Sequence, residues 1–296
     1  RIFNPEIQSH GWESKYTTRV ILCPGIPFTT ASVRGEINRR ALRIHTIASC
    51  NLAVQRDEQG ELNAVLAHNG DHAEDPGEAL MFFEIGRHSK PEDLADLQEA
   101  LTDILAEVRS VVTYYPLVCE RLHAAAEDIQ NSTCVPQEHR DEAVKFLQWL
   151  ENNHMTLLGY EYIKVKRTGS DTRVKVGKEA SLGILRLRKT RGVLDLQADI
   201  ETLSLEQMHR KQLSYSKSQQ RSRVHRLTYP DYVIVKVFDD AGEIVGQHRF
   251  VGLYTSSVYT MNPNLIPILR HKVDQIMALS DQQWAAHESR ELARGL

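Results

Sequence analysis

Basic side chains that could bind an anion gather in one segment of the chain and in the hairpin that follows it. Arginine binds carboxylate or phosphate through two parallel hydrogen bonds, so a hairpin that folds several of these residues together could hold one anion. The alternative is a solvated, charged sheet surface, which we expect for Arg223 and Lys236. The candidates for an anion-binding or structural cluster are Lys217, Arg221, His225, Arg226 and Arg249.

A second candidate site is the loop CPGIPFT at residues 23–29, which follows an apolar run. Backbone N–H groups at the start of the next helix can hold a carboxylate, and Gly25 lets a ligand approach the backbone closely. The plainer alternative is a Pro/Gly turn that only starts a helix. The candidate effector-binding residues are Pro24, Gly25, Ile26, Phe28 and Thr29.

Motifs of known enzyme chemistry are missing from the sequence. It contains no GxGxxG, GxxxxGK[ST], HExxH, GxSxG or DxDxDG pattern. His68 and His72 lie in an acidic loop, and Cys119 and His123 lie four apart on a predicted helix, without a second pair of metal ligands near either. We therefore expect no catalytic residues, no bound cofactor and no metal in this segment.

Composition limits the function classes further. The chain has 296 residues, enough for two domains, and a net charge of −3, which argues against nucleic-acid binding. No apolar run approaches the roughly 20 residues that span a bilayer, and no signal peptide is recognisable. The four widely spaced cysteines are typical of reduced thiols in the cytoplasm. The first residue, Arg1, suggests that the sequence is part of a longer protein.

Residues 1–132 predict a ferredoxin-like sandwich in the order β-α-β-β-(β)-α. The strands are expected at 17–23, 43–55, 61–67 and 80–86. One helix follows Pro27, with Val33 and Ile37 inward and Arg34, Glu36, Arg39 and Arg40 outward. Another begins near Ser89 and should end or kink at Pro116.

Residues 133–296 predict an antiparallel sheet with flanking helices, similar to a PAS or GAF domain. Expected helices cover 143–150, part of 190–211 and 263–279, and expected strands cover 156–167, 173–176 and 182–187. The clearest prediction is a hairpin, 232–238 and 243–254, joined by the turn DDAG. The fold class is therefore α+β with two antiparallel domains.

The segment SKSQQRSRVHRLTYPDYVIVKVFDDAGEIVGQHRFVGLYTSSVY, followed by IPILRHKV, resembles one known family. Weaker matching pieces are FLQWLENNHMTLLGYEYI and IPFTTASVRGEINRRALRIHTI. The chain is similar to the N-terminal regulatory region of the large bacterial NAD-specific glutamate dehydrogenases. The resemblance implies ACT-like and PAS-like modules, a catalytic region beyond Leu296 that uses NAD, an amino-acid effector and a homo-oligomer.

We therefore expect a non-catalytic segment that regulates and assembles a glutamate dehydrogenase, an enzyme of amino-acid catabolism. Two alternatives stay open. One is a stand-alone ligand-sensing or interaction module. The other is a small enzyme that acts on an anionic substrate through the Arg/His cluster, with Ser218, Ser222 or Tyr232 as its nucleophile or base.

Overall fold

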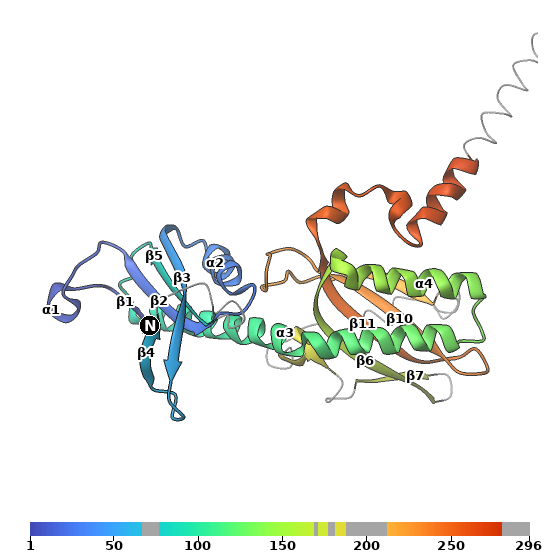
Figure 1. The fold of residues 1–296 in the computed structure, drawn as a ribbon, viewed down its shortest axis with the longest axis horizontal. Helices are drawn as coiled ribbons and strands as arrows, with labels where there is room; N and C mark the ends of the chain where they lie inside the picture. Colours follow the sequence, from blue (N-terminus) through green and yellow to red (C-terminus); the bar gives the residue numbers. More distant parts are fainter. Residues whose placement is uncertain (67–76, 169–170, 177–180, 188–211, 280–296) are drawn as a thin grey trace, which may run out of the picture. The chain divides into compact units, whose positions relative to one another are not determined.

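The computed structural model describes residues 1–66, 77–168, 171–176, 181–187 and 212–279 (Figure 1). It contains two compact units. The first comprises residues 1–114 and 219–229, and the second comprises 115–218 and 230–296. These limits differ from the predicted domains, 1–132 and 133–296, because one helix contributes to both units and because residues 219–229 pack with the first.

The first unit contains a five-stranded sheet in which every pairing is antiparallel. β5 lies between β2 and β3, so β2, α2 and β3 form a split β-α-β arrangement. β1 pairs with the outer edge of β2, with Ile2 opposite Arg19. In sheet order the strands are β1 (Ile2–Phe3), β2 (Thr17–Pro24), β5 (Glu78–Ile85), β3 (Ile44–Arg56) and β4 (Leu62–Leu66).

The core of this unit lies on one face of the sheet. Every second residue of β5 is buried, which is the period expected of a strand with one covered face. α2 (Thr29–Arg39) contributes Val33 and Ile37, both fully buried, and α3 (Pro91–Asn131) contributes Leu97, Leu101 and Ile104. The short helix α1 (Ile7–His10) buries no residue. The α+β fold class and the expected element order are confirmed for this half of the chain.

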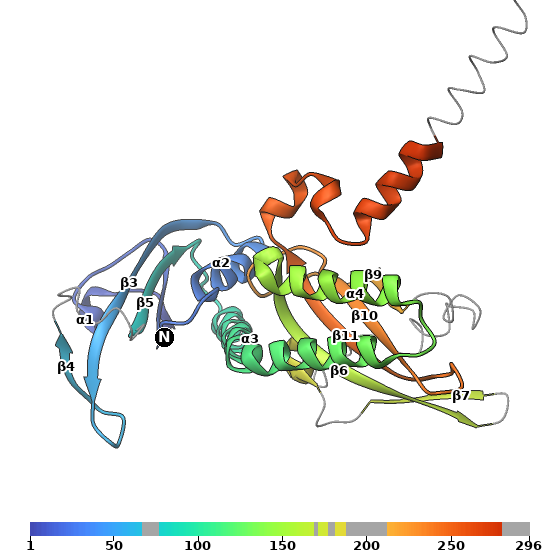
Figure 2. The same ribbon diagram turned by 45° about the vertical axis from the view of Figure 1, so that its right-hand side comes forward.

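The second unit contains another antiparallel sheet, flanked by α4 (Gln137–Trp149) and by the later part of α3. Figure 2 shows these two helices side by side along the sheet. The strand order places the first and last long strands, β6 and β11, next to each other. In sheet order the strands are β7 (Asp171–Val176), β6 (Met155–Thr168), β11 (Ile244–Tyr254), β10 (Asp231–Phe238) and β9 (Leu213–Lys217).

The predicted hairpin is confirmed as β10 and β11, with Ile234 opposite Arg249 in the register. Asp239 builds the turn between them. Its carboxylate accepts hydrogen bonds from the N–H groups of Ala241 and Glu243 at 3.0 and 2.9 Å, and Gly242 adopts the left-handed φ of 80° that the turn needs.

Two element predictions were wrong, and one alternative of a third is excluded. The helix was expected to end or kink at Pro116, and α3 does not end there. Residues 182–187 form only a two-residue strand, β8 (Leu182–Gly183), followed by α5 (Ile184–Leu187). The helix expected at 263–279 begins at residue 269, after the short 3-10 helices η4 (Ser256–Thr260) and η5 (Pro263–Leu265). Pro267 explains the delay, because a proline disfavours helical geometry in the residue before it, and Ile266 is extended at φ −94° and ψ 117°.

Two further expectations concern residues outside the described part of the chain: the acidic loop with His68 and His72, and the short helix within 190–211. Among the helices that the structure describes, none has both the length and the apolar character needed to cross a membrane. α4 ends at Trp149 and is followed by a π-helical turn, η1 (Leu150–His154). Asn153 in this turn adopts a left-handed conformation, with φ 58°.

Candidate functional site

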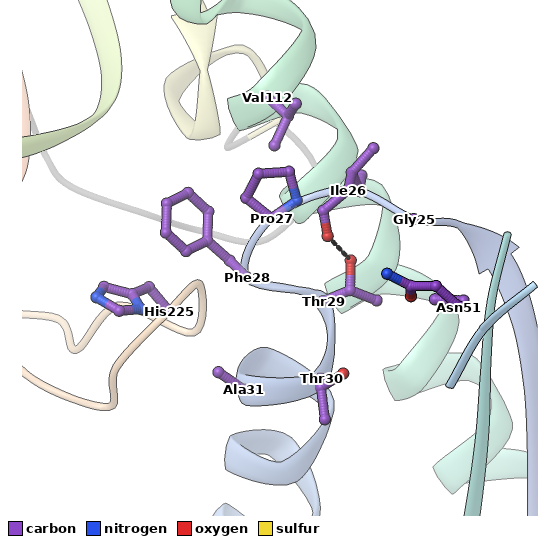
Figure 3. A pocket seen from close by; sticks show the side chains of 11 residues that line it. Gly25, Ile26, Pro27, Phe28, Thr29, Thr30, Ala31, Asn51, Val112 and His225 are labelled. Carbon is purple, nitrogen blue, oxygen red and sulfur yellow. Dashed lines mark hydrogen bonds between the residues drawn. The ribbon is translucent and has the colours of Figure 1, made fainter. Parts of the chain in front are cut away.

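The turn between β2 and α2 forms one wall of a cavity of about 730 Å³ in the first unit (Figure 3). Phe28 precedes α2 in a left-handed conformation, φ 69°, which is uncommon for a residue with a side chain. Two hydrogen bonds hold the turn: the Thr29 hydroxyl donates to the Ile26 carbonyl at 2.8 Å, and the Ser32 N–H donates to the Phe28 carbonyl at 2.9 Å.

The first turn of α2 presents hydrogen-bond donors at this cavity. The N–H groups of Thr29, Thr30 and Ala31 precede the first intrahelical bond, and no side chain caps them. They have no hydrogen-bond partner among the described residues. All three residues line the cavity, so it offers backbone donors, with the positive end of a helix dipole, to an anionic group.

The rest of the cavity wall comes from four other parts of the first unit. Asn51 on β3 lies opposite Ala79 on β5, and Figure 3 shows its side chain pointing toward Thr29. Val112 comes from α3. With Ile26, Pro27 and Phe28, these residues make a site with an apolar side and a polar side, as is usual for small-molecule pockets.

His225 completes the cavity from a segment that is remote in sequence. Its ring lies 4.9 Å from the Phe28 ring, between centroids. Burial lowers the pKa of His225, and the neighbouring positive charge of Arg226 lowers it further. The imidazole is therefore favoured in its neutral form, in which one ring nitrogen donates and the other accepts a hydrogen bond.

Four of the five predicted effector residues, Gly25, Ile26, Phe28 and Thr29, line this cavity, and Pro24 does not line it. Sequence reasoning missed Asn51, Ala79 and Val112. Each lies on another element, and only the pairing of β2, β5 and β3 brings the first two beside the loop. The strand alternation gave a signal, since Asn51, Ala79 and Cys23 share one face, but the register was needed to use it.

The five residues of the predicted basic cluster are distributed over both units. Lys217 donates to Asp231 at 2.9 Å, and Arg249 is 3.4 Å from Glu161 with its guanidinium over the Tyr232 ring at 4.9 Å. These residues belong to the second unit. Arg221, His225 and Arg226 belong to the first, where Arg221 lies over the Tyr229 ring at 5.3 Å.

Arg223 was wrongly assigned to the solvated surface. Its Nε lies 3.2 Å from a Glu36 carboxylate oxygen, its Nη1 lies 3.0 Å from Glu107, and its Nη2 donates to the Ala100 carbonyl at 3.2 Å. Lys236, which was also assigned to the surface, is 2% exposed. Helix spacing alone could not identify the partner of Arg223, because Glu36 lies 187 residues away in sequence.

Glu36 was predicted to point outward and is fully buried. Burial alone would raise its pKa, but a hydrogen bond from Arg39, the charge of Arg223 and a hydrogen bond from Arg40 outweigh burial and lower the pKa. The Arg39 Nε donates to it at 2.9 Å. The residue is thus a buried carboxylate surrounded by three guanidinium groups, which is the condition under which a buried charge is tolerated.

A second buried polar group occurs in the other unit. His248 accepts or donates through both ring nitrogens, 2.9 Å from the Tyr160 hydroxyl and 2.8 Å from Asp128 on α3. Burial lowers the pKa of His248, and Asp128 opposes this shift. These hydrogen bonds join β6, β11 and α3, so we assign the three residues a structural role. Among the described residues, no group of three or more His, Cys, Asp or Glu could hold a metal ion.

Known proteins with similar sequences include most of this site. Residues 1–101 match a family model described as "Glutamate dehydrogenase, ACT1 domain". The NAD-specific glutamate dehydrogenase of Halomonas elongata is 33% identical over 99% of this chain. That of Pseudomonas aeruginosa is 35% identical over the whole chain. Along its length the chain is similar to a part of the NAD-specific glutamate dehydrogenases, and its first 101 residues match their ACT1 domain. The resemblance drawn from the sequence is therefore confirmed.

The matches cover only part of the relatives and only part of the cavity. The chain spans 18% of the length of these two relatives, and 14% of the enzyme of Mycobacterium tuberculosis, to which it is 26% identical over 84% of its own length. The ACT1 match includes the loop at 23–29, Asn51 and Ala79. It leaves out Val112 and His225, so two walls of the cavity lie outside the matched module.

Proposed function

We propose that this chain is a non-catalytic regulatory and subunit-assembly segment of a larger NAD-dependent glutamate dehydrogenase. Its relatives carry that name, and the chain covers only a fraction of their length. The parent enzyme would convert glutamate and NAD to 2-oxoglutarate, ammonium and NADH in a catalytic region outside these residues, in the cytoplasm. Residues 1–132 would act as the ACT-like domain and residues 133–296 as the PAS-like domain.

The regulatory part of the proposal rests on one observation, the unpaired amides of Thr29, Thr30 and Ala31 at the wall of a cavity. A carboxylate suits these donors. The Asn51 side-chain amide at the cavity wall can exchange hydrogen bonds with a ligand's ammonium or carboxylate group, and Phe28 and Val112 offer an apolar surface to a side chain. Those three features together match a free α-amino acid, which is also the chemical class of the parent enzyme's substrate.

Regulation needs more than binding, because a ligand shifts a population only when it binds two states unequally. The proposed effector must therefore favour one arrangement of this cavity over another. The alternative of a small enzyme has less support. The Ser222 hydroxyl, one of its candidate nucleophiles, is buried and donates to the Val224 carbonyl at 2.9 Å, so it is engaged within its own turn.

Calorimetric titration of the chain with each free amino acid tests the ligand role. We expect one or a few to bind, and Asn51→Ala to weaken the binding about tenfold or more, since hydrogen bonds to charged groups contribute roughly 1.5–3 kcal/mol. Ser49→Ala is the matched control, because Ser49 lies on the same face of β3 opposite Met81 and does not line the cavity. The absence of a binding heat with every amino acid would reject the ligand role.

A second observation favours assembly. Several large apolar side chains of the first unit are exposed, on β2, on β3 and on the β4 strand that extends the sheet. Isolated exposed residues of this kind need no explanation, but apolar residues that share the open face of a sheet are typical of a surface that another chain covers. The register places Leu22 and Val65 together on the face away from the buried side chains of β5. Ile47, Leu62 and Leu66 lie on the other face, and Trp12 precedes β2.

A further inference from the structure

Residues 219–229, which we call the strap, connect two strands of one unit but pack in the other. They lie between β9 and β10, which are paired with each other in the second sheet, with Asp231 opposite Lys217. The Ser218 N–H also donates to the Pro230 carbonyl at 2.8 Å, so the two ends of the strap are closed together. The strap itself belongs to the first unit.

The strap is attached to α2 at three points. Arg223 reaches the buried Glu36 carboxylate, the His225 N–H donates to the Ser32 hydroxyl at 2.9 Å, and Leu227 lies against Gly35, where an added Cβ would be 3.5 Å from the leucine side chain. Val224 is fully buried. These contacts are specific enough to fix the strap in one position on the helix.

One residue of the strap serves the cavity. His225 is held in a left-handed conformation, φ 67°, which is uncommon for a residue with a side chain and needs support from its surroundings. The bond from its N–H to Ser32 and the contact of its ring with Phe28 give this support. The cavity therefore has its His225 wall only while the strap is attached.

Helix α2 contributes both to the cavity and to the attachment of the strap. The N–H groups of Thr29, Thr30 and Ala31 line the cavity, and Ser32, Gly35 and Glu36, farther along the helix, contact the strap. A ligand that contacts His225 binds the attached form better than the detached form. By linkage, such a ligand must strengthen the attachment by the same factor by which attachment strengthens its binding.

We propose that occupancy of the cavity is coupled to attachment of the strap, whose two ends continue as β9 and β10 of the second unit. This inference rests on the proposed amino-acid site. It adds that attachment of the strap changes when the site is occupied. The Arg223–Glu36 pair is the anchor, and His225 is the residue through which a ligand senses the strap.

Hydrogen exchange of the whole chain tests the anchor without any ligand. In Arg223→Met we expect amides of residues 219–229 to exchange about tenfold faster or more, while β10 and β11 keep their protection. Arg34→Met is the control, because Arg34 is an exposed arginine of the same helix. His225→Asn provides a milder variant, since asparagine tolerates a left-handed φ while the ring contact with Phe28 is lost. Unchanged exchange at 219–229 in Arg223→Met would overturn the inference.

Titration of the same variants with the amino acid that binds best tests the coupling. Wild-type chain with ligand should show slower exchange at 219–229, and both strap variants should bind at least roughly fivefold more weakly. Equal affinity in wild type and both variants would overturn the coupling and leave the ligand role standing. Absence of binding to the wild type would overturn the ligand role and the coupling together, and the exchange measured without ligand distinguishes these outcomes.

Discussion

Single charged residues explain why distant parts of this chain meet. Glu36, Arg223 and Glu161 are all largely buried, and each has a partner of opposite charge on another segment. Removing one member of such a pair costs about 3–5 kcal/mol, because it leaves an uncompensated buried charge. Their contribution therefore lies in fixing which segments pack together more than in adding net stability.

His248 gives a prediction about pH. Its pKa in the folded chain lies below the value near 6.5 of an unfolded histidine, mainly because of burial, so the unfolded chain takes up the proton first as the pH falls. Folded stability from this residue is present above about pH 6.5 and decreases on acidification. We expect the Tm of wild type to fall between pH 8 and pH 5.5.

His248→Gln should reduce that fall, since glutamine can bond to Tyr160 and Asp128 without titrating. The charged and titratable groups around the imidazole are Asp128, Arg121, Tyr160 and Tyr162, and all are retained in the variant. Thermal unfolding at several pH values measures the difference. Parallel curves for wild type and variant would contradict the assignment, because His225, whose pKa is also lowered, is common to both.

Helices and strands were predictable where a periodic pattern and its end signals agreed. The hairpin of β10 and β11 followed from alternating residues and the turn DDAG, and α2 followed from the spacing of Val33 and Ile37. The sequence could not show that α3 continues through Pro116. The apolar stripe resumes beyond the proline with Val118, Leu122, Ala125 and Ile129, all buried, and this packing outweighs the local cost of the proline.

Pro116 therefore destabilises α3 locally, and replacing it should remove this destabilisation. It is exposed within α3, lacks the N–H that an interior helical residue donates, and crowds the preceding turn. We expect Pro116→Ala to raise the free energy of unfolding by about 1–3 kcal/mol. Denaturant titration measures the change, with Leu117→Ala as a neighbouring exposed control. A loss of stability in Pro116→Ala would show that the helix depends on the proline's geometry.

At the scale of the whole molecule, the sequence indicated the loop at 23–29 but not the cavity around it. A cavity is defined by elements that meet in space, and here they are the loop, two strands, α3 and the strap. His225 was selected for its neighbours in a basic segment, whereas the structure places it beside Phe28. The pairing of Arg223 with Glu36, which attaches the strap, has no counterpart in local sequence patterns.

The exposed apolar side chains of the first unit predict self-association. Leu22 is 48% exposed on β2, paired with Leu80 on β5. If copies of the chain associate through this sheet, Leu22→Glu should raise the dissociation constant tenfold or more, because it places a charge in an apolar contact. Sedimentation equilibrium measures it, with Ile276→Glu as an exposed control from residues 269–279. A wild-type chain that stays monomeric at all concentrations would contradict the assembly role.

The most direct measurement of the central claim is a residue-resolved amide NMR spectrum of the chain during titration with the amino acid that binds best. The account predicts the largest shifts at the N–H groups of Thr29, Thr30 and Ala31, with further shifts at Asn51 and His225. Saturable shifts confined to other residues, or an unchanged spectrum with every amino acid, would contradict it.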